Sequence, residues 1–184
     1  MTKERTISAI TPNVPEAVAK PILDACCGSR MFWFDKNNEN VDYMDIRELD
    51  TTLCDGRRLV VKPDILGDFT KMPFPDNTYK LVVFDPPHLN RGGDNSWIVQ
   101  KYGRLPKDSW PQYIHDGVAE CLRVLDEYGV LVFKWNEEQI TIGEILRVLP
   151  VQPLFGHTTT HKGTTHWMCF MKFPQMEGGD NENK

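Results

Sequence analysis

Short hydrophobic runs alternate along this chain with segments whose hydrophobic positions recur at helical spacing. In residues 80–85 a run of apolar residues leads into an acid. A continuous run this short, rich in β-branched and aromatic residues, predicts a fully buried strand. Further runs predict strands over residues 21–25, 41–46, 59–61, 64–68, 130–133, 153–159 and 165–173. Because most of these runs lack polar alternation, we expect a sheet that is covered on both faces.

Two segments carry the periodicity of amphipathic helices. Ile114 and Val118 fall on one stripe of a helix predicted over 113–126, and residues 141–149 predict a shorter helix. A third, short helix is predicted over 30–36, with an aromatic face formed by Phe32, Trp33 and Phe34. Strands that alternate with helices predict an α/β fold. We expect a Rossmann-like, doubly wound, mostly parallel seven-stranded sheet that ends in a C-terminal antiparallel hairpin.

The chain length of 184 residues fits one domain with a substantial core. We expect this domain to span 21–173, preceded by a flexible N-terminal arm (1–20) and followed by a disordered tail (174–184) without apolar anchors. Within the domain, residues 89–110 show no periodicity. A loop of that length is usually functional or mobile, so we interpret it as a substrate loop.

Composition narrows the class of protein. The chain is 40% hydrophobic, has five cysteines without a framework spacing, and lacks the long apolar run of a membrane helix or signal peptide. These features predict a cytoplasmic protein with reduced thiols and no membrane partner. The net charge of -5 argues against a protein that binds nucleic acid through an overall positive surface charge, so any contact with nucleic acid must be local.

Candidate chemistry follows the run at 80–85, where the sequence continues Asp85-Pro86-Pro87-His88. Two prolines cannot continue a sheet, so the backbone must leave the strand directly after Asp85. The acid is therefore presented at the carboxyl end of a strand, where open α/β sheets bind ligands. The alternative is a strand that simply ends in a rigid Pro-Pro turn.

Three more positions lie at expected strand ends. Gly28 follows the first strand, where a missing Cβ lets backbone approach a ligand, although a plain turn is the alternative. Asp45 ends the second strand, where an acid can accept both hydroxyls of a ribose. An exposed carboxylate or helix cap is its alternative. Asp68 is either part of a ligand site or an ordinary turn aspartate.

The order of these elements resembles that of class I S-adenosylmethionine-dependent methyltransferases. The resemblance is carried by Leu23-Asp24-Ala25-Cys26-Cys27-Gly28-Ser29, Asp45, Gly67-Asp68 and Asp85-Pro86-Pro87-His88. The last element is similar to the (D/N/S)PP(Y/F/W) tetrapeptide of the branch that methylates exocyclic amines. Small phage-associated DNA N6-adenine methyltransferases of that branch are the most similar.

The resemblance implies that S-adenosyl-L-methionine is the cofactor and that it binds near the first three strands. Arg30 stands where the family usually has a second glycine. This departure leaves the geometry of the cofactor loop open, and pairing of Arg30 with the cofactor carboxylate is one alternative. The implied cofactor-binding residues are Asp24, Ala25, Cys26, Gly28, Arg30, Asp45, Ile46, Asp68 and Phe69.

The resemblance implies catalytic roles for Asp85, Pro86, Pro87 and His88. An exocyclic amine is a poor nucleophile, and a carboxylate and a main-chain carbonyl that accept its N–H bonds can aim it at a methyl group. The family's fourth residue is normally aromatic and stacks on the flipped base. His88 can stack, hydrogen-bond or titrate instead, so the target can differ from a typical flipped base.

Within 89–110, aromatic and basic residues are interleaved, and the candidate substrate-binding residues are Arg91, Trp97, Tyr102 and Arg104. The alternative is an ordinary solvated loop. The predicted activity is methyl transfer to an amino nitrogen of a nucleic acid, DNA being favoured over RNA, with a specificity partner or homodimer as a possibility. A protein glutamine substrate and a non-catalytic binding module are the alternatives. His157, His161, His166 and Cys169 are irregularly spaced, so no metal is expected.

Overall fold

The structure is a computed structural model that describes residues 20–159 and 164–174. The expected N-terminal arm, apart from Lys20, and the expected tail, apart from Pro174, lie outside these residues. So does the turn expected between the last two strands.

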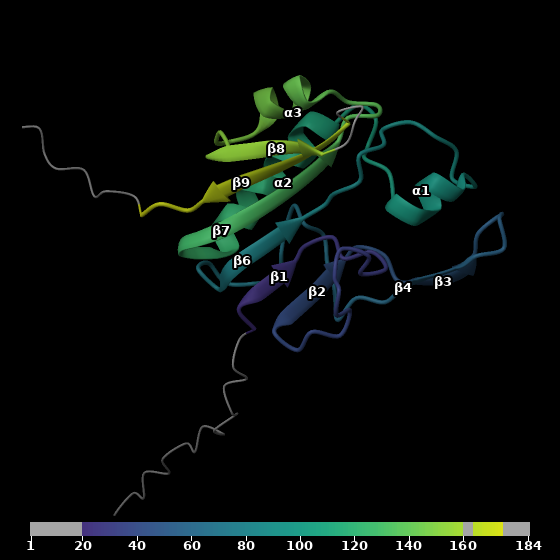
Figure 1. The fold of residues 1–184 in the computed structure, drawn as a ribbon, viewed down its shortest axis with the longest axis horizontal. Helices are drawn as coiled ribbons and strands as arrows, with labels where there is room; N and C mark the ends of the chain where they lie inside the picture. Colours follow the sequence, from purple (N-terminus) through teal and green to yellow (C-terminus); the bar gives the residue numbers. More distant parts are fainter. Residues whose placement is uncertain (1–19, 160–163, 175–184) are drawn as a thin grey trace, which may run out of the picture.

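Seven strands form one sheet in the order β5-β2-β1-β6-β7-β9-β8 (Figure 1). Every pairing from β5 to β7 is parallel, whereas β9 pairs antiparallel with both β7 and β8. The predicted fold class is therefore confirmed, including its terminal hairpin. The strands are β1 (Ile22–Asp24), β2 (Val41–Asp45), β5 (Ile65–Leu66), β6 (Tyr79–Phe84), β7 (Leu125–Asn136), β8 (Phe155–Thr159) and β9 (Thr165–Met171).

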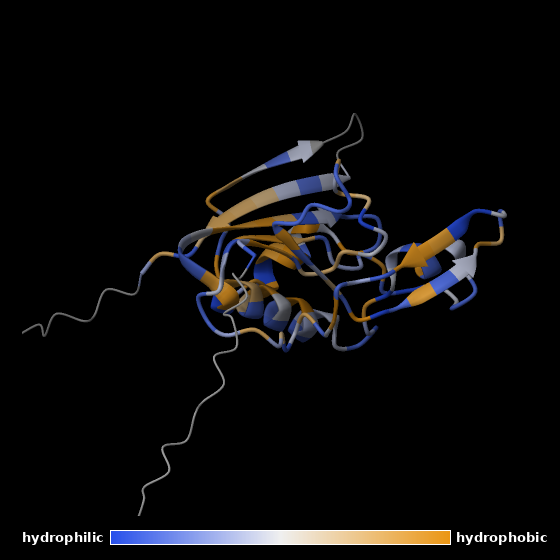
Figure 2. Cartoon of the chain, turned by 90° about the horizontal axis from the view of Figure 1, so that it is seen from below, coloured by the Kyte–Doolittle hydropathy of each residue, from blue (hydrophilic) through white to orange (hydrophobic). Residues whose placement is uncertain are grey.

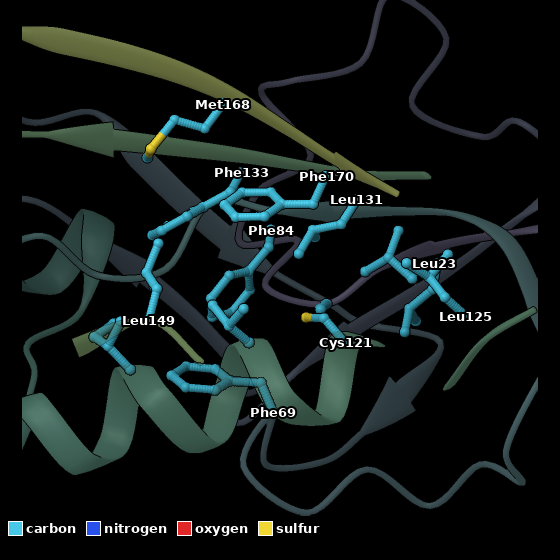
Figure 3. Close-up of a cluster of buried hydrophobic side chains, with 14 of the residues drawn as sticks. Leu23, Phe69, Phe84, Cys121, Leu125, Leu131, Phe133, Leu149, Met168 and Phe170 are labelled. Carbon is cyan, nitrogen blue, oxygen red and sulfur yellow. The ribbon is translucent and has the colours of Figure 1, made fainter. Parts of the chain in front are cut away.

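Two helices pack on one face of the sheet and close the main hydrophobic core (Figure 3). They are α2 (Trp110–Val124) and α3 (Ile142–Val148), both of which were predicted within a few residues. Gly117 permits the close approach of α2, because a Cβ there would lie 2.7 Å from Phe69 and 3.0 Å from Phe84. A capping box between Thr141 and Glu144 fixes the start of α3.

The opposite face, over β1 and β2, is covered by irregular chain. The helix predicted over 30–36 is wrong, since this segment forms turns and bends. Gly28 and Arg30 take positive φ angles of 50° and 55°, which an α-helix does not contain. The aromatic residues do not share one face either, because Trp33 packs on β2 at Tyr43 while Phe34 is fully exposed.

A small lobe projects beyond the carboxyl edge of the sheet (Figures 1 and 2). It comprises a hairpin, β3 (Leu49–Thr52) with β4 (Arg58–Val61), and the six-residue helix α1 (Trp97–Tyr102). The sequence predicted only the second hairpin strand, and it predicted no helix in 89–110. The hairpin has a core of its own, formed by Leu53, Leu59 and Val61. We call the hairpin and α1 together the lobe.

Within residues 20–159 and 164–174, no helix has the length and apolar character needed to cross a membrane.

Candidate functional site

The carboxyl ends of β1, β2 and β6 bring three acids together. Asp24 and Asp45 end their strands, and Asp85 directly follows β6, which pairs with β1 in parallel register. Two adjoining cavities open here, with empty volumes of about 470 and 500 Å³ that include space open to solvent. Cys26, Arg47, Asp85 and Tyr102 line both cavities. The two cavities therefore form one continuous cleft, as the order of elements predicted.

The first cavity is built around the turn that follows β1. Asp24 is only 2% exposed, and its two carboxylate oxygens accept hydrogen bonds from Trp33 Nε1 (2.7 Å) and the Cys26 N–H (3.2 Å). Burial raises the pKa of Asp24 to about 7, although both hydrogen bonds act to lower it. A cationic ligand group that binds in this cavity would therefore stabilise the ionised form of Asp24 and lower its pKa. Gly28 and Phe32 also line it.

The second cavity lies beside Asp45, which is 5% exposed. Its carboxylate accepts hydrogen bonds from the Gly28 N–H (2.9 Å), the Arg47 N–H (2.9 Å) and Arg47 Nε (3.1 Å). Three of its roughly four acceptor positions are thus engaged within the chain. Arg47 also donates to the Gln100 carbonyl (3.2 Å), which ties this corner to α1.

Apolar side chains form the far wall of the second cavity. Ile46 is 53% exposed there, and Phe69, Tyr113 and Ala25 line it as well. Asp68 does not line either cavity. Its carboxylate accepts from the Thr70 N–H and hydroxyl (both 2.8 Å) and from the Tyr113 hydroxyl (3.2 Å), as a turn aspartate does. Of the two neighbouring residues implied to bind the cofactor, Phe69 therefore lines the cavity and Asp68 supports the turn before it.

Asp85 lies where the two cavities meet, and it forms an ion pair with Lys134 (Oδ2 to Nζ, 2.7 Å). Lys134 belongs to β7, the strand next to β6. Its ammonium lies 5.5 Å from the ring centroid of Phe32 and 5.9 Å from that of Trp167. Among the described residues, Oδ1 of Asp85 accepts no hydrogen bond, so one oxygen is held and the other is available to a ligand.

The rest of the tetrapeptide surrounds this corner. Pro86 is buried, and Pro87 lines the second cavity. His88 packs against Tyr102 of α1, with ring centroids 5.3 Å apart. Burial lowers the pKa of His88, and the opposing effect of Asp85 is smaller. His88 is therefore neutral around pH 7, and it lines neither cavity of the cleft.

The four residues proposed for substrate binding separate into two groups. Tyr102 and Arg104 line the cleft, and Arg104 also pairs with Asp94 (2.9 Å). Arg91 and Trp97 line neither cavity. The Arg91 N–H is held by the Gln139 side chain (2.9 Å), while Trp97 is 41% exposed on the lobe.

Arg30 lies outside the cleft. Its guanidinium donates to the Lys36 carbonyl (2.9 Å), the Lys62 carbonyl (3.1 Å) and Asp64 (2.7 Å), and it stacks 3.8 Å from the centroid of Tyr43. With these four partners, Arg30 joins two segments of chain and is directed away from both cavities.

Sequence reasoning missed Arg47, which lines both cavities, and Lys134, which pairs with Asp85. Lys134 follows a buried apolar run, so the rule that identified Asp85, a charge at the carboxyl end of a buried strand, could have found it. In the part of the chain that the structure describes, no three metal-ligating side chains cluster together.

Similarity to solved structures supports the fold. The PH0226 protein of Pyrococcus horikoshii superimposes with a TM-score of 0.53 at 13% identity, over 82% of this chain and 81% of that one. A SAM-dependent methyltransferase of Methanosarcina mazei gives 0.49 at 12% identity, over 84% and 92%. A TehB-like SAM-dependent methyltransferase of Corynebacterium glutamicum gives 0.48 at 16% identity, over 84% and 80%.

No protein-family profile matches the chain, and no curated protein sequence matches it either. The superposition on the PH0226 protein supports the overall fold, and two other similar structures are described as SAM-dependent methyltransferases. At these identities the likeness concerns the fold, and the chemistry has to be argued from the cleft itself.

Proposed function

We propose that this protein is an S-adenosyl-L-methionine-dependent methyltransferase that acts on an amino nitrogen, with N6 of adenine in DNA as the favoured acceptor. The observation that carries the proposal is one continuous cleft at the carboxyl edge of the sheet. It joins a glycine turn, two buried acids and the corner formed by Asp85 and Lys134.

The residues of the cleft fit the cofactor. Asp24, buried and with a pKa of about 7, suits the ammonium of the methionine part, because a cation beside it would supply the missing charge partner. Asp45 suits the ribose through its remaining acceptor position. Ile46 and Phe69 provide apolar surface for a purine ring. When bound, the cofactor supplies an electrophilic methyl group.

The corner at Asp85 would orient the acceptor. An exocyclic amine can donate one N–H to Asp85 Oδ1 and the other to the Pro86 carbonyl, which turns the nitrogen lone pair toward the methyl group. Lys134 holds Oδ2, so the carboxylate cannot rotate freely. Transfer would form the N–C bond as the bond between the methyl group and the cofactor's sulfonium sulfur breaks, with its electron pair left on sulfur. The nitrogen would then lose a proton, for which Asp85 Oδ1 is the acceptor in this arrangement.

One planar group in the cleft favours a nucleobase as the acceptor. Tyr102 lines both cavities, packs against the uncharged ring of His88 and offers a face on which a base can stack. This surface is compatible with a neutral base. Among the described residues, it carries no anionic group besides Asp85 that would favour a cationic acceptor. RNA and a protein glutamine are the other acceptors with a suitable amine.

One observation favours a second candidate, a non-catalytic module that binds S-adenosyl-L-methionine. His88, which stands where the family normally has an aromatic residue that stacks on the base, lines neither cavity of the cleft. A module of this kind would bind the cofactor without transferring its methyl group.

Calorimetric titration with S-adenosyl-L-methionine and with its demethylated product tests the cofactor, and radiolabelled methyl incorporation into DNA, RNA and protein tests the acceptor. We expect binding of both compounds and incorporation into DNA. Asp85→Ala, which removes the acceptor oxygen, should abolish incorporation and leave the cofactor affinity unchanged. Absence of cofactor binding would refute the proposal, and cofactor binding without incorporation would favour the module.

A further inference from the structure

A groove runs from the cleft along the base of the lobe. One wall is the irregular segment around Ser29 and Met31, and the other is β4 with the residues that follow it. The groove consists of two hollows, with empty volumes of about 740 and 970 Å³, that share Ser29, Lys36 and Val60. It is continuous with the first cavity of the cleft, because Ser29, Met31 and Lys101 line both.

The charge of the groove is opposite to that of the protein. The whole chain has 26 acids and 21 lysines and arginines, with a net charge of -5. Among the described residues that line the groove, Asp64 is the one carboxylate. The cationic side chains that line it are Arg30, Lys36, Arg57, Arg58, Lys62 and Lys101.

The arginines of the groove are already paired, whereas its lysines are not. Arg57, Arg58 and Arg30 form ion pairs with Asp55, Asp50 and Asp64, respectively. Lys36, Lys62 and Lys101 form no ion pair with any described carboxylate. These three ammonium groups are therefore the ones available to an anionic ligand.

Arg30 fixes the two walls relative to each other. Its guanidinium donates to the main-chain carbonyls of both Lys36 and Lys62, which belong to opposite walls. The main chain at both lysines is thus held by one side chain, which is itself held by Asp64 and Tyr43. Both lysines therefore extend from backbone that the fold fixes on the two walls of the groove.

We propose that this groove binds the phosphodiester backbone of the nucleic acid that presents its amine to the cleft. The inference rests on the proposed function, in which a nucleic acid carries the acceptor. An open, cationic channel that leads into the site suits a long polyanion, because phosphate contacts position a strand without reading its sequence. DNA and RNA share this chemistry.

Fluorescence anisotropy over a series of salt concentrations tests the inference, with labelled duplex DNA, single-stranded DNA and single-stranded RNA as probes. The variant is Lys36→Gln combined with Lys62→Gln. Its matched control is Lys71→Gln combined with Arg147→Gln, which removes the same charge from exposed positions outside the groove. Circular dichroism establishes that both proteins are folded.

Loss of two phosphate contacts should lower the slope of log affinity against log salt by about 2 for duplex DNA, which corresponds to about a thirtyfold weaker complex near 0.15 M salt. For single strands the complex should be weakened by about half that factor, because the salt slope per phosphate contact is smaller. The control should bind as the wild type does. The tightest of the three probes identifies the nucleic acid.

Equal slopes for the variant and its control would overturn the inference, as would wild-type protein that binds none of the probes. Calorimetry with the cofactor separates this failure from that of the proposed function. Normal cofactor binding without nucleic-acid binding refutes the groove alone. Lysine-dependent nucleic-acid binding without cofactor binding supports the groove and refutes the methyltransferase.

Discussion

Replacement of Asp24 by asparagine should make this protein more stable at pH 8 and less stable at pH 4. Asp24 is buried, and its pKa is raised from 3.8 to about 7 in the folded protein, mainly by desolvation. In the unfolded chain its pKa returns to the ordinary value. The folded state therefore binds more protons than the unfolded state between about pH 4 and pH 7.

The sign and size of the effect follow from this difference. Since the folded state holds the extra proton, stability decreases as the pH rises through this window and is unaffected by Asp24 below it. A difference of about 3 pKa units corresponds to about 4 kcal/mol, all of which is lost at pH 8. Because Asp24 is only 2% exposed, solvent screens little of this cost.

Asparagine has the same shape and does not ionise. Its one carbonyl oxygen can accept from Trp33 Nε1 or from the Cys26 N–H, whereas the carboxylate accepts from both. The lost hydrogen bond costs about 1–2 kcal/mol at every pH. We therefore expect Asp24→Asn to be destabilised by that amount at pH 4, equal to wild type near pH 5, and stabilised by about 2–3 kcal/mol at pH 8.

Urea denaturation at pH 4, 5, 6, 7 and 8 measures the free energy of unfolding of both proteins, and the difference between them cancels the titration of other groups. Glu39→Gln removes an exposed carboxylate from the same segment and is the control. Its difference from the wild type should show no comparable slope. An Asp24→Asn difference that stays constant from pH 4 to pH 8 would refute the burial argument.

The same acid couples cofactor binding to pH. If the ammonium of S-adenosyl-L-methionine ionises Asp24, affinity should rise about tenfold per pH unit below pH 7 and level off above it. Asp24→Asn should bind weakly at every pH. Calorimetry between pH 5.5 and pH 8 measures this, and an affinity independent of pH would exclude Asp24 as the ammonium partner.

Two further substitutions test the packing behind the cleft and the corner within it. Gly117→Ala would place a Cβ 2.7 Å from Phe69, so we expect a loss of about 1–2 kcal/mol in urea denaturation and weaker cofactor binding. Gly143→Ala is its control, because the nearest atom there is 3.9 Å away, and unchanged or raised stability is expected. Equal losses at both glycines would contradict the packing argument. Lys134→Gln frees Asp85, and turnover on the identified acceptor should fall about tenfold or more with cofactor affinity unchanged. Partial recovery in Lys134→Arg would support a positioning role, and wild-type turnover in Lys134→Gln would refute it.

The sequence predicts an element of this fold well when the contacts that stabilise it lie close together along the chain, and poorly when they do not. The buried strands were predictable because a short apolar run has few other structures available to it, and residues 80–85 placed Asp85 correctly at the sheet edge. The helix over 30–36 was predicted from an aromatic cluster, but those side chains have separate tertiary partners. Trp33 reaches Asp24, and Phe32 packs on Trp167. No local pattern records such contacts.

Most of the lobe could not be predicted from local sequence patterns for the same physical reason. Its hairpin is stabilised by a few residues, Leu53, Leu59 and Val61, that are buried only because the chain folds back on itself. The cations of the groove are scattered from Arg30 to Lys101 in the sequence, among more numerous acids, so the net charge of -5 conceals them. An acidic total therefore does not exclude a nucleic-acid substrate. The proposed contact with nucleic acid rests instead on the cations that the fold gathers in the groove beside the cleft.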